Sequence, residues 1–187
     1  GKVCNMEKIS EISKKYNLKI IEDSAQGMGS YYKGKHAGTF GEISAFSAHP
    51  LKNLNAVGDS GFVITNDEQL YNHIKLYRSH GMQSRDNVKI FGINSRLDSL
   101  NAEILSYRLK KLKDVIEKRR NNIVLYKKYI KTDKVILPKD NDDTFDSYVM
   151  MISLCENRNE LQSFLKSRNI QSLVYYGTPL HLHDASK

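Results

Sequence analysis

Apolar side chains recur every three or four residues near the start of the chain, in residues 5–17. This spacing is typical of a helix that buries one face against a core. The apolar positions are Met6, Ile9, Ile12 and Tyr16. Asn5 stands before the first of them and is a residue type that caps helix N-termini, so the pattern predicts a helix capped by Asn5.

Three short segments rich in apolar residues follow, and each has the length of a strand. They cover residues 18–22, 43–47 and 61–65. A second helix is predicted after the third run, because Asn66 and Gln69 form the capping-box pattern that opens helices. A helix, three strands and another helix, joined by short connections, indicate an α/β layered structure.

A helical pattern then runs through residues 97–130, which is longer than most helices of a compact domain. We therefore expect a bend in this helix or a bridge between two domains. Beyond it, Asn157 is the predicted cap of a shorter helix at 157–168. Strands are predicted on either side of that helix, at 148–154 and 170–176. This second β-α-β group predicts a smaller domain after the long helix.

The composition is that of an ordinary globular protein. Of 187 residues, 40% are hydrophobic and 27% are charged, which excludes collagen-like, disordered and disulfide-rich classes. No run approaches the roughly 18 consecutive apolar residues of a membrane span, so no membrane partner is expected. Cys4 and Cys155 lack the spacing of zinc ligands, and we expect a reduced, cytoplasmic protein without a metal site. The chain starts at Gly1 without an initiator methionine, and we expect a tag remnant, processing or an excised piece.

The net charge of +8 arises in one segment of the chain. Residues 108–131 hold ten basic and two acidic side chains, and the remaining residues are neutral overall. A basic stripe on a solvated helix is the favoured interpretation. A polyanion-binding module is the alternative, but specific RNA readers usually add an aromatic platform to their charge. The aromatic residues here are only Tyr107, Tyr126 and Tyr129, and we expect no nucleic-acid partner.

Three polar segments lie at strand ends or in loops, where α/β proteins carry their binding sites. The first, residues 22–26, follows a predicted strand and contains Asp23. A carboxylate there suits a metal, a ribose hydroxyl or a protonated ring nitrogen, and equally a turn or a helix cap. The residues alone leave these alternatives open.

The second segment, residues 47–53, contains Lys52, the only charged residue between Ile43 and Gly58. A solvated surface lysine is the ordinary interpretation. A lysine just after a buried strand, beside serine, histidine and asparagine, is also the amine that a Schiff base needs once desolvation removes its proton.

The third segment, residues 92–98, leads into the long helix and contains Asn94, Ser95 and Arg96. These side chains suit an anion at the helix N-terminus. A simple cap by Asn94 or Ser95 is an equal alternative.

Taken in order, these segments resemble the DegT/DnrJ/EryC1/StrS family of pyridoxal-phosphate-dependent aminotransferases, which act on nucleotide-linked keto-sugars. Residues 22–26 resemble its acid motif, residues 47–54 and 58–61 its lysine motif, and residues 92–98 the segment before its long helix. Residues 176–181 resemble a turn of its small domain. Four motifs in this order along nearly the whole chain make the match specific. Family chains are longer at both ends, so we expect this sequence to be an internal fragment.

The resemblance implies roles for five residues. Lys52 would bond to pyridoxal phosphate as a Schiff base and then carry the proton between the donor carbon and the cofactor. Asp23 would pair with the protonated pyridine nitrogen and keep the ring an electron sink. Gln26 would donate to the ring's 3-oxygen and Ser47 to the phosphate. Asn94 would reach the phosphate bound in the neighbouring subunit, so the resemblance implies a homodimer with shared active sites.

The fold implied by the resemblance is the α/β fold of type I pyridoxal-phosphate-dependent transferases, which is similar to aspartate aminotransferase. Residues 1–106 would be the C-terminal part of the large cofactor-binding domain. Residues 107–187 would be the bridging helix and an incomplete small α/β domain. In the family, the ring-stacking residue and a further phosphate-binding turn come from the region that corresponds to sequence before Gly1, so the fragment alone is expected to be inactive.

The function implied by the resemblance is transfer of an amino group, with glutamate as the expected donor, to a keto group of a nucleotide-linked deoxy-sugar. Such products serve surface polysaccharide or glycoconjugate biosynthesis. Lysine rather than histidine at position 52 favours amino transfer over dehydration. His49 is assigned no role beyond loop packing. The alternative within the same fold is a non-catalytic sensor or regulator.

Overall fold

The computed structural model describes all 187 residues, which form two compact units. Unit 1 consists of Gly1–Ile130 and Pro138–Met151, and unit 2 of Lys131–Leu137 and Ile152–Lys187. The domain boundary predicted after residue 106 concerns a longer protein and stays a prediction. None of the helices is both long enough and apolar enough to cross a membrane.

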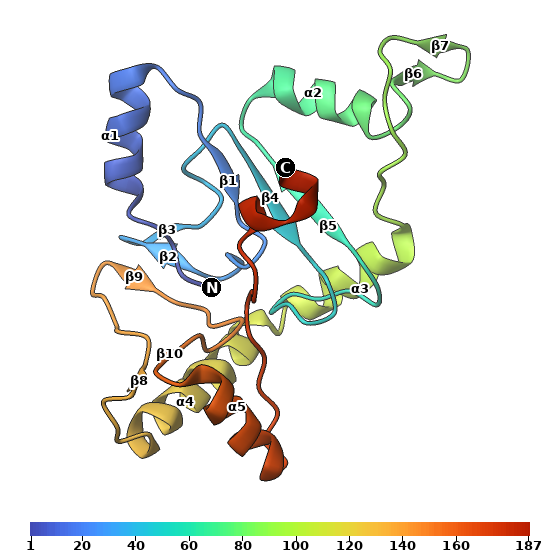
Figure 1. The fold of residues 1–187 in the computed structure, drawn as a ribbon. Helices are drawn as coiled ribbons and strands as arrows, with labels where there is room; N and C mark the ends of the chain where they lie inside the picture. Colours follow the sequence, from blue (N-terminus) through green and yellow to red (C-terminus); the bar gives the residue numbers. More distant parts are fainter. The chain divides into compact units, whose positions relative to one another are not determined.

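A three-stranded sheet forms the centre of unit 1 (Figure 1). Its order is β1 (Ile21–Asp23), β4 (Ile43–Ser47) and β5 (Gly61–Ile64). β1 runs parallel to β4, with Asp23 opposite Ala45, and β5 runs antiparallel to β4. The predicted strand at 43–47 is confirmed, whereas β1 starts three residues later than predicted because only Ile21–Asp23 pair with β4.

Helix α1 (Met6–Tyr16) is confirmed together with its cap. The Asn5 side chain accepts a hydrogen bond from the backbone N–H of Lys8 at 3.1 Å, which satisfies one of the free N–H groups of the first turn. Met6 points inward and joins Val3, Tyr32 and Ala37 in one of the two cores of unit 1.

A second small sheet joins segments that are far apart in the sequence. Its order is β3 (Lys35–His36), β2 (Tyr31–Tyr32) and β9 (Thr144–Phe145), and all its pairs are antiparallel. Strands of two residues carry too little periodicity to be recognised in the sequence. The pairing of β2 with β9 brings residues 144–149 back to the start of the chain.

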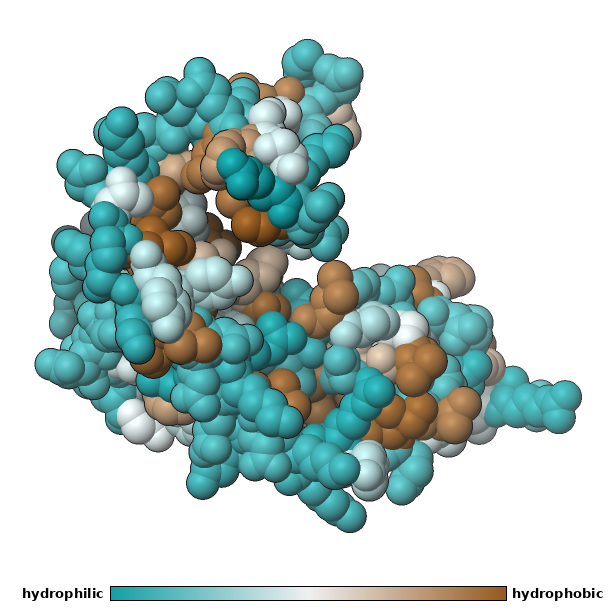
Figure 2. All heavy atoms as spheres, turned by 90° about the horizontal axis from the view of Figure 1, so that it is seen from below, coloured by the Kyte–Doolittle hydropathy of each residue, from teal (hydrophilic) through white to brown (hydrophobic).

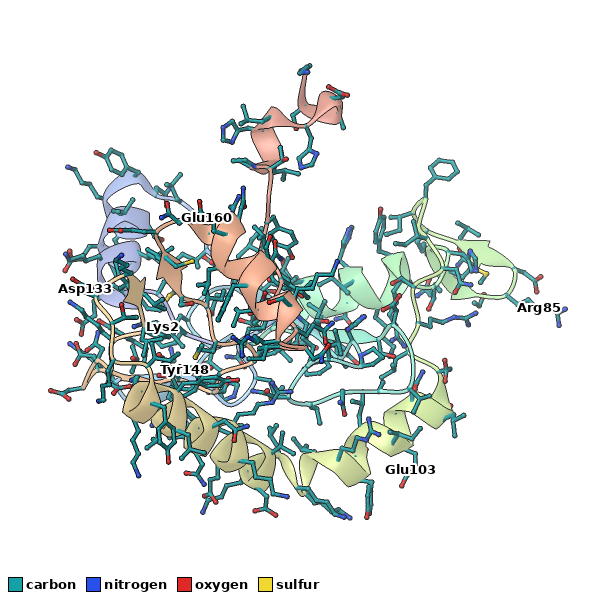
Figure 3. All side chains as sticks on the ribbon, turned by 60° about the horizontal axis from the view of Figure 1, so that its bottom comes forward. Lys2, Arg85, Glu103, Asp133, Tyr148 and Glu160 are labelled. Carbon is teal, nitrogen blue, oxygen red and sulfur yellow. The ribbon has the colours of Figure 1, made fainter.

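Helix α2 (Glu68–Tyr77) follows the central sheet, but its predicted cap was wrong by one residue. Asp67, and not Asn66, accepts the hydrogen bond of the first turn, from Leu70 N at 3.0 Å. Thr65 causes this shift, because its Oγ1 accepts the N–H of Asp67 at 3.0 Å and turns the chain there. A hairpin of β6 (Met82–Ser84) and β7 (Asn87–Val88) follows α2, with Arg85 at its tip (Figure 3).

The predicted long helix is two helices, α3 (Ser99–Leu109) and α4 (Leu112–Tyr129), so the expected bend is confirmed at residues 110–111. Leu105 of α3 and Ile116 of α4 are buried, whereas Glu103 points to solvent (Figure 3). The cap of α3 is Asp98, which accepts from Asn101 N at 3.3 Å. Neither Asn94 nor Ser95 caps this helix, and that alternative was wrong.

Unit 2 contains a strand pair and one α-helix. Strands β8 (Val135–Ile136) and β10 (Leu154–Cys155) pair antiparallel, and α5 (Arg158–Ser167) follows them. Two short 3-10 helices, η1 (Leu180–Leu182) and η2 (Asp184–Ser186), lie near the end of the chain.

Two of the strands predicted near unit 2 were wrong. Tyr148 has a left-handed backbone, with φ of 49°, which is incompatible with an extended strand. Of the strand predicted at 148–154, only Leu154 lies in a strand. Residues 170–176 pair with no strand in the 187-residue structure. Asn157 precedes α5 as predicted, but it also has φ of 49° and makes no side-chain cap bond.

Candidate functional site

Four of the five predicted site residues lie at or after the same edge of the central sheet. Asp23 ends β1 and Ser47 ends β4, and these two strands are parallel and in register. Their carboxyl ends therefore meet at one edge, which is where open α/β sheets bind ligands. Gln26 lies half-buried in the turn after β1, and Lys52 lies half-buried in the loop after β4.

Asp23 combines a turn contact with an exposed carboxylate. Its Oδ1 accepts a hydrogen bond from Ala25 N at 3.0 Å, which fixes the side chain at the start of the turn. The side chain is nevertheless exposed, so the carboxylate is available to a ligand at the sheet edge. The turn contact and a binding role are thus compatible at this residue.

Glu22, the neighbour of Asp23, faces the interior and organises the loop of residues 38–41. Its two carboxylate oxygens accept hydrogen bonds from Gly38 N at 2.7 Å, Phe40 N at 2.5 Å and Gly41 N at 2.7 Å. Gly38 has φ of 85°, and a Cβ there would collide with the ring of Phe46, so only glycine fits this close approach. No separate role was predicted for Glu22. Strand alternation would have indicated that, of the adjacent Glu22 and Asp23, one side chain points inward.

Two buried serines next to the exposed Asp23 join the end of β1 to β4 by a hydrogen bond. Ser44 Oγ lies 2.9 Å from Ser24 Oγ, and both side chains are buried. The backbone N–H of Ser24 donates to Ala45 O at 2.9 Å. These bonds hold the backbone at Asp23 against the end of β4.

The loop of residues 48–60, here called the Lys52 loop, is held by hydrogen bonds between its own ends and packs into the second core of unit 1. Ala48 N donates to Ser60 O at 2.7 Å and Ala56 N donates to Ala48 O at 2.8 Å. The buried side chains of this core are Ala48, Leu54, Ala56 and Leu105, the last from α3. Because residues on both sides of Lys52 are buried, the loop has a defined conformation where the lysine leaves it.

His49 is part of the internal structure of the loop. Its backbone carbonyl accepts from Lys52 N at 2.9 Å, and its Nδ1 accepts from Leu51 N at 3.2 Å. Its Nε2 lies 3.7 Å from Oδ1 of Asp59. These contacts agree with the loop-packing role expected for this histidine.

Helix α3 holds the far end of the Lys52 loop through polar contacts that the sequence did not reveal. Arg108 Nη1 donates to the backbone and side-chain oxygens of Asn55, at 2.7 and 2.6 Å. Asn101 Oδ1 accepts from Val57 N at 3.1 Å. Arg108 belongs to the basic run that was interpreted as a solvated stripe, and nothing in its local sequence distinguishes it from its neighbours.

The other arginines of the basic run are also engaged within unit 1. Arg119 Nη1 donates to Val149 O and Arg120 Nη1 donates to Asp146 O, both at 2.7 Å. The guanidinium of Arg120 also lies 4.2 Å from the ring centroid of Phe145, a cation–π contact. These arginines hold residues 145–149 against α4, which weakens the interpretation of the run as a polyanion-binding surface.

Asn94 lies apart from the other four predicted site residues. It is exposed, pairs with Ser79 as an isolated bridge below the β6–β7 hairpin, and accepts from Arg96 Nε at 3.1 Å. No hydrogen bond joins it to Asp23, Gln26, Ser47 or Lys52 within the 187 described residues. Its bridge and its hydrogen bond are thus with the segments next to the β6–β7 hairpin.

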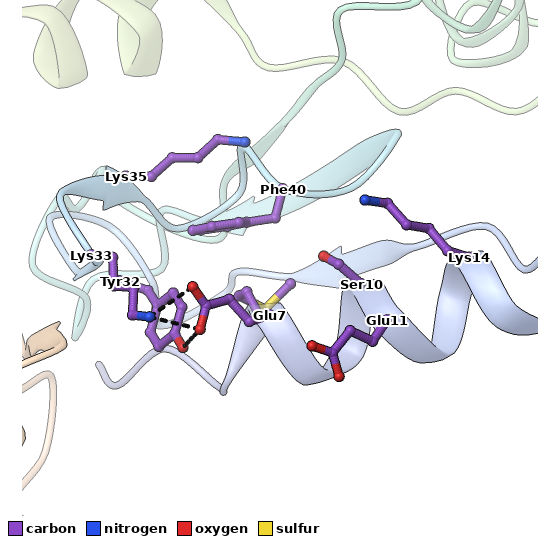
Figure 4. A pocket seen from close by; sticks show the side chains of 9 residues that line it. Glu7, Ser10, Glu11, Lys14, Tyr32, Lys33, Lys35 and Phe40 are labelled. Carbon is purple, nitrogen blue, oxygen red and sulfur yellow. Dashed lines mark hydrogen bonds and ion pairs between the residues drawn. The ribbon is translucent and has the colours of Figure 1, made fainter.

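An open surface groove of about 480 Å³ lies between α1 and the β2–β3 hairpin, and it contains none of the predicted site residues (Figure 4). Lys33 hydrogen-bonds to Glu7 at 2.7 Å and holds the pKa of this carboxyl below its usual value. The same contact raises the pKa of Lys33. Glu7 and Lys33 thus neutralise each other within the groove.

The residues at the sheet edge fit pyridoxal phosphate by the chemistry of their donor set. An exposed carboxylate suits a protonated ring nitrogen, a half-buried amine suits an aldehyde, and an amide and a hydroxyl suit a ring oxygen and a phosphate. The four residues at this edge supply one group of each kind. Among the 187 residues, no group of three or more histidine, cysteine or acidic side chains could hold a metal ion.

Comparison with known proteins gives one consistent family. The sequence model of the DegT/DnrJ/EryC1/StrS aminotransferase family matches residues 1–187. The chain is 40% identical over 185 residues to a dTDP-3-amino-3,6-dideoxy-alpha-D-galactopyranose transaminase of Aneurinibacillus thermoaerophilus, a match that covers 99% of this chain and 51% of that protein. It is 38% identical over 185 residues to a pleiotropic regulatory protein of Geobacillus stearothermophilus, which covers 97% of this chain and 50% of the relative.

Solved structures agree with the sequence relatives. The crystal structure of DesV from S. venezuelae, in complex with a ketimine intermediate, superposes with a TM-score of 0.90 at 33% identity and covers 98% of this chain. This chain spans 50% of that structure. It likewise spans about half the length of the curated relatives that it matches.

Proposed function

Because the chain belongs to the DegT/DnrJ/EryC1/StrS aminotransferase family, we propose that the longer protein transfers an amino group to a keto group of a nucleotide-linked sugar, with pyridoxal phosphate as cofactor. The single observation that carries this proposal is the arrangement at the sheet edge, where Asp23 and the Lys52 loop follow adjacent parallel strands. The relative named above as a dTDP-3-amino-3,6-dideoxy-alpha-D-galactopyranose transaminase supports the substrate class.

The residues of this chain then have separate tasks. Bound pyridoxal phosphate supplies an electron sink for the reacting carbon. Lys52 holds the cofactor and carries the proton at its amine nitrogen, and Asp23 keeps the ring nitrogen protonated through its carboxylate. Gln26 orients the ring by donating to its 3-oxygen, and the Ser47 hydroxyl donates to the phosphate.

We further propose that the protein is a homodimer in which Asn94 completes the site of the partner. Support comes from its exposed side chain and from its bridge to Ser79 beside the β6–β7 hairpin, without a hydrogen bond to the other four predicted site residues. The neighbouring hairpin region is also unusually apolar for a free surface, since Phe91 is 100% exposed and Ile93 is 49% exposed. Figure 2 shows apolar side chains, in brown, at many places on one face of the molecule. Exposed apolar surface of this kind is typical of protein–protein contact.

A regulator with the same fold is the second candidate function. One specific observation favours it, namely the similarity to the pleiotropic regulatory protein of Geobacillus stearothermophilus. Such a protein would keep the cofactor-holding lysine without productive amino transfer.

A single half-reaction separates the two candidates. The longer protein loaded with pyridoxal phosphate is mixed with excess glutamate, and 2-oxoglutarate is measured. An aminotransferase releases about one equivalent of 2-oxoglutarate per site in the absence of the keto-sugar, because the amino group stays on the cofactor. The matched control is Lys52→Ala, which should release none. A wild-type protein that holds the cofactor at Lys52 and releases no 2-oxoglutarate would support the regulator instead.

A further inference from the structure

A buried polar cluster lies directly behind the Lys52 loop and has no role in the site described above. Ser30 and Ser147 are 0% exposed and Asn53 is 5% exposed. Ser30 Oγ donates to Gly1 O at 2.8 Å, and the two serine hydroxyl oxygens lie 2.8 Å apart. Since the hydroxyl proton of Ser30 points to a carbonyl, Ser147 is the donor between the two hydroxyls.

Asn53 connects this cluster to the loop, and its orientation is fixed by chemistry. Its Nδ2 lies 3.1 Å from the carbonyl oxygen of Ser147, which can only accept a hydrogen bond. The Oδ1 atom is consequently directed into the protein, where it is buried and has no hydrogen-bond partner. An unpaired buried carbonyl lowers stability, so this amide carries a cost that offsets part of the gain from its bond to Ser147. The amide is therefore better explained by what it fixes than by its contribution to stability.

The residue that the amide fixes is Lys52, which directly precedes Asn53. On one side the backbone of Lys52 is held by the bond from its N–H to His49 O at 2.9 Å. On the other side the Asn53 side chain ties the loop to Ser147. Ser147 is itself firmly placed, because Arg120 and Arg119 bind the carbonyls of Asp146 and Val149 on either side of it.

We propose that Asn53 is a positioning residue for Lys52, and that its bond to the Ser147 carbonyl sets the direction in which the lysine side chain reaches the cofactor. This inference rests on the proposed function, in which Lys52 holds pyridoxal phosphate. Asn53 acts only through Lys52 and touches neither cofactor nor substrate in this account.

The test uses the longer protein loaded with pyridoxal phosphate and two variants, Asn53→Ala and Asn53→Leu. Loss of the bond to Ser147 O lets the lysine move towards solvent. Better solvation favours the protonated, cationic form of the lysine–cofactor linkage. The midpoint of the pH titration of the cofactor absorption band should therefore rise by about one pH unit, a roughly tenfold change in the equilibrium. Turnover should fall about tenfold or more, because small misplacements of reacting groups are costly, while KM for the keto-sugar stays within about twofold.

Ser30→Ala is the matched control, because it removes a buried hydroxyl from the same cluster and leaves the Asn53–Ser147 bond in place. It should lower thermal stability without moving the titration midpoint, whereas Asn53→Leu should move the midpoint. An unchanged midpoint in Asn53→Leu, or an equal shift in Ser30→Ala, overturns the proposal. If the wild-type protein forms no cofactor band on Lys52, the proposed function fails first, and this inference fails with it.

Discussion

At the level of single residues, the candidate site is built from one exposed and one buried acid placed side by side. Asp23 presents its carboxylate at the sheet edge, while Glu22 turns inward and accepts three backbone hydrogen bonds. Strand alternation separates the two side chains. Their chemistry therefore differs although their sequence positions are adjacent, and substitution of each should have a different effect.

Asp23→Asn should abolish most activity and leave the fold intact. A neutral amide cannot stabilise a proton on the ring nitrogen, and loss of one electrostatic contact of this kind costs about 100-fold or more in turnover. The contact to Ala25 N is retained by the amide oxygen, so the unfolding midpoint should stay close to the wild-type value. Steady-state kinetics and thermal unfolding of the longer protein measure both. Activity within twofold of the wild-type value would contradict the role of Asp23.

Glu22→Gln should do the opposite and lower stability. The glutamine NH2 group would face backbone N–H groups of residues 38–41 that now donate to a carboxylate. Leaving such donors unpaired costs about 2–3 kcal/mol in the free energy of unfolding. Urea unfolding of the longer protein measures this loss. As a control, Glu103→Gln on the solvent side of α3 should change the unfolding free energy by less than about 0.5 kcal/mol.

At the level of elements, the sequence predicted best the helices and strands whose own residues carry the apolar pattern or the cap. Helix α1 has both its apolar spacing and its Asn5 cap, and β4 is a short segment rich in apolar residues, so both were correctly located. The failures came where tertiary contacts decide. Tyr148 adopts a left-handed backbone at the start of an apolar segment that otherwise resembles a strand. The pairing of β2 with β9 joins residues more than 100 positions apart, which no local pattern can indicate.

The candidate site shows the same limit. Asp23 and Lys52 could be proposed because strand ends and isolated charges are visible in a sequence, and because their motifs resemble a known family. Arg108 was missed because its contact with Asn55 joins a helix to a loop some fifty residues earlier. Ten basic residues in one run look alike, and only the fold separates the arginines that bind carbonyls from the solvated lysines.

Arg108→Ala should loosen the Lys52 loop without unfolding the protein. It removes two hydrogen bonds to Asn55 at the end of that loop, and a locally weakened segment opens more often. Hydrogen exchange of residues 52–58 should become about tenfold faster or more, with smaller changes elsewhere. Lys110→Ala, an exposed substitution on the same run, is the control. Equal exchange in the two variants would show that α3 does not hold the loop.

At the level of the whole molecule, the chain spans about half of its relatives and leaves large apolar side chains exposed, such as Ile21 at 77% and Phe91 at 100%. Exposed apolar area on this scale favours burial against further protein. The proposed homodimer supplies part of that contact and gives Asn94 a site to complete. A site shared between subunits can be restored by mixing two defective variants, whereas a site within one chain cannot.

Mixing two inactive variants should restore activity if the site is shared. In a heterodimer of Lys52→Ala and Asn94→Ala, one site carries both defects and the other carries neither. Random exchange of subunits gives heterodimers in half of the population, so about one quarter of wild-type activity should return. Separate assays of the two variants provide the baseline. No recovery after subunit exchange, confirmed by exchange of tagged subunits, would place Asn94 in the site of its own chain or outside any site.

The central claim is that Lys52 holds the cofactor, and chemical trapping tests it most directly. The longer protein is loaded with pyridoxal phosphate, reduced with borohydride, digested and mapped by mass spectrometry. We predict one stable adduct, on Lys52, that is absent in Lys52→Ala and retained in the control Lys35→Ala, at an exposed lysine of β3. An adduct on another lysine, or a protein that binds the cofactor without a reducible bond to Lys52, would contradict it.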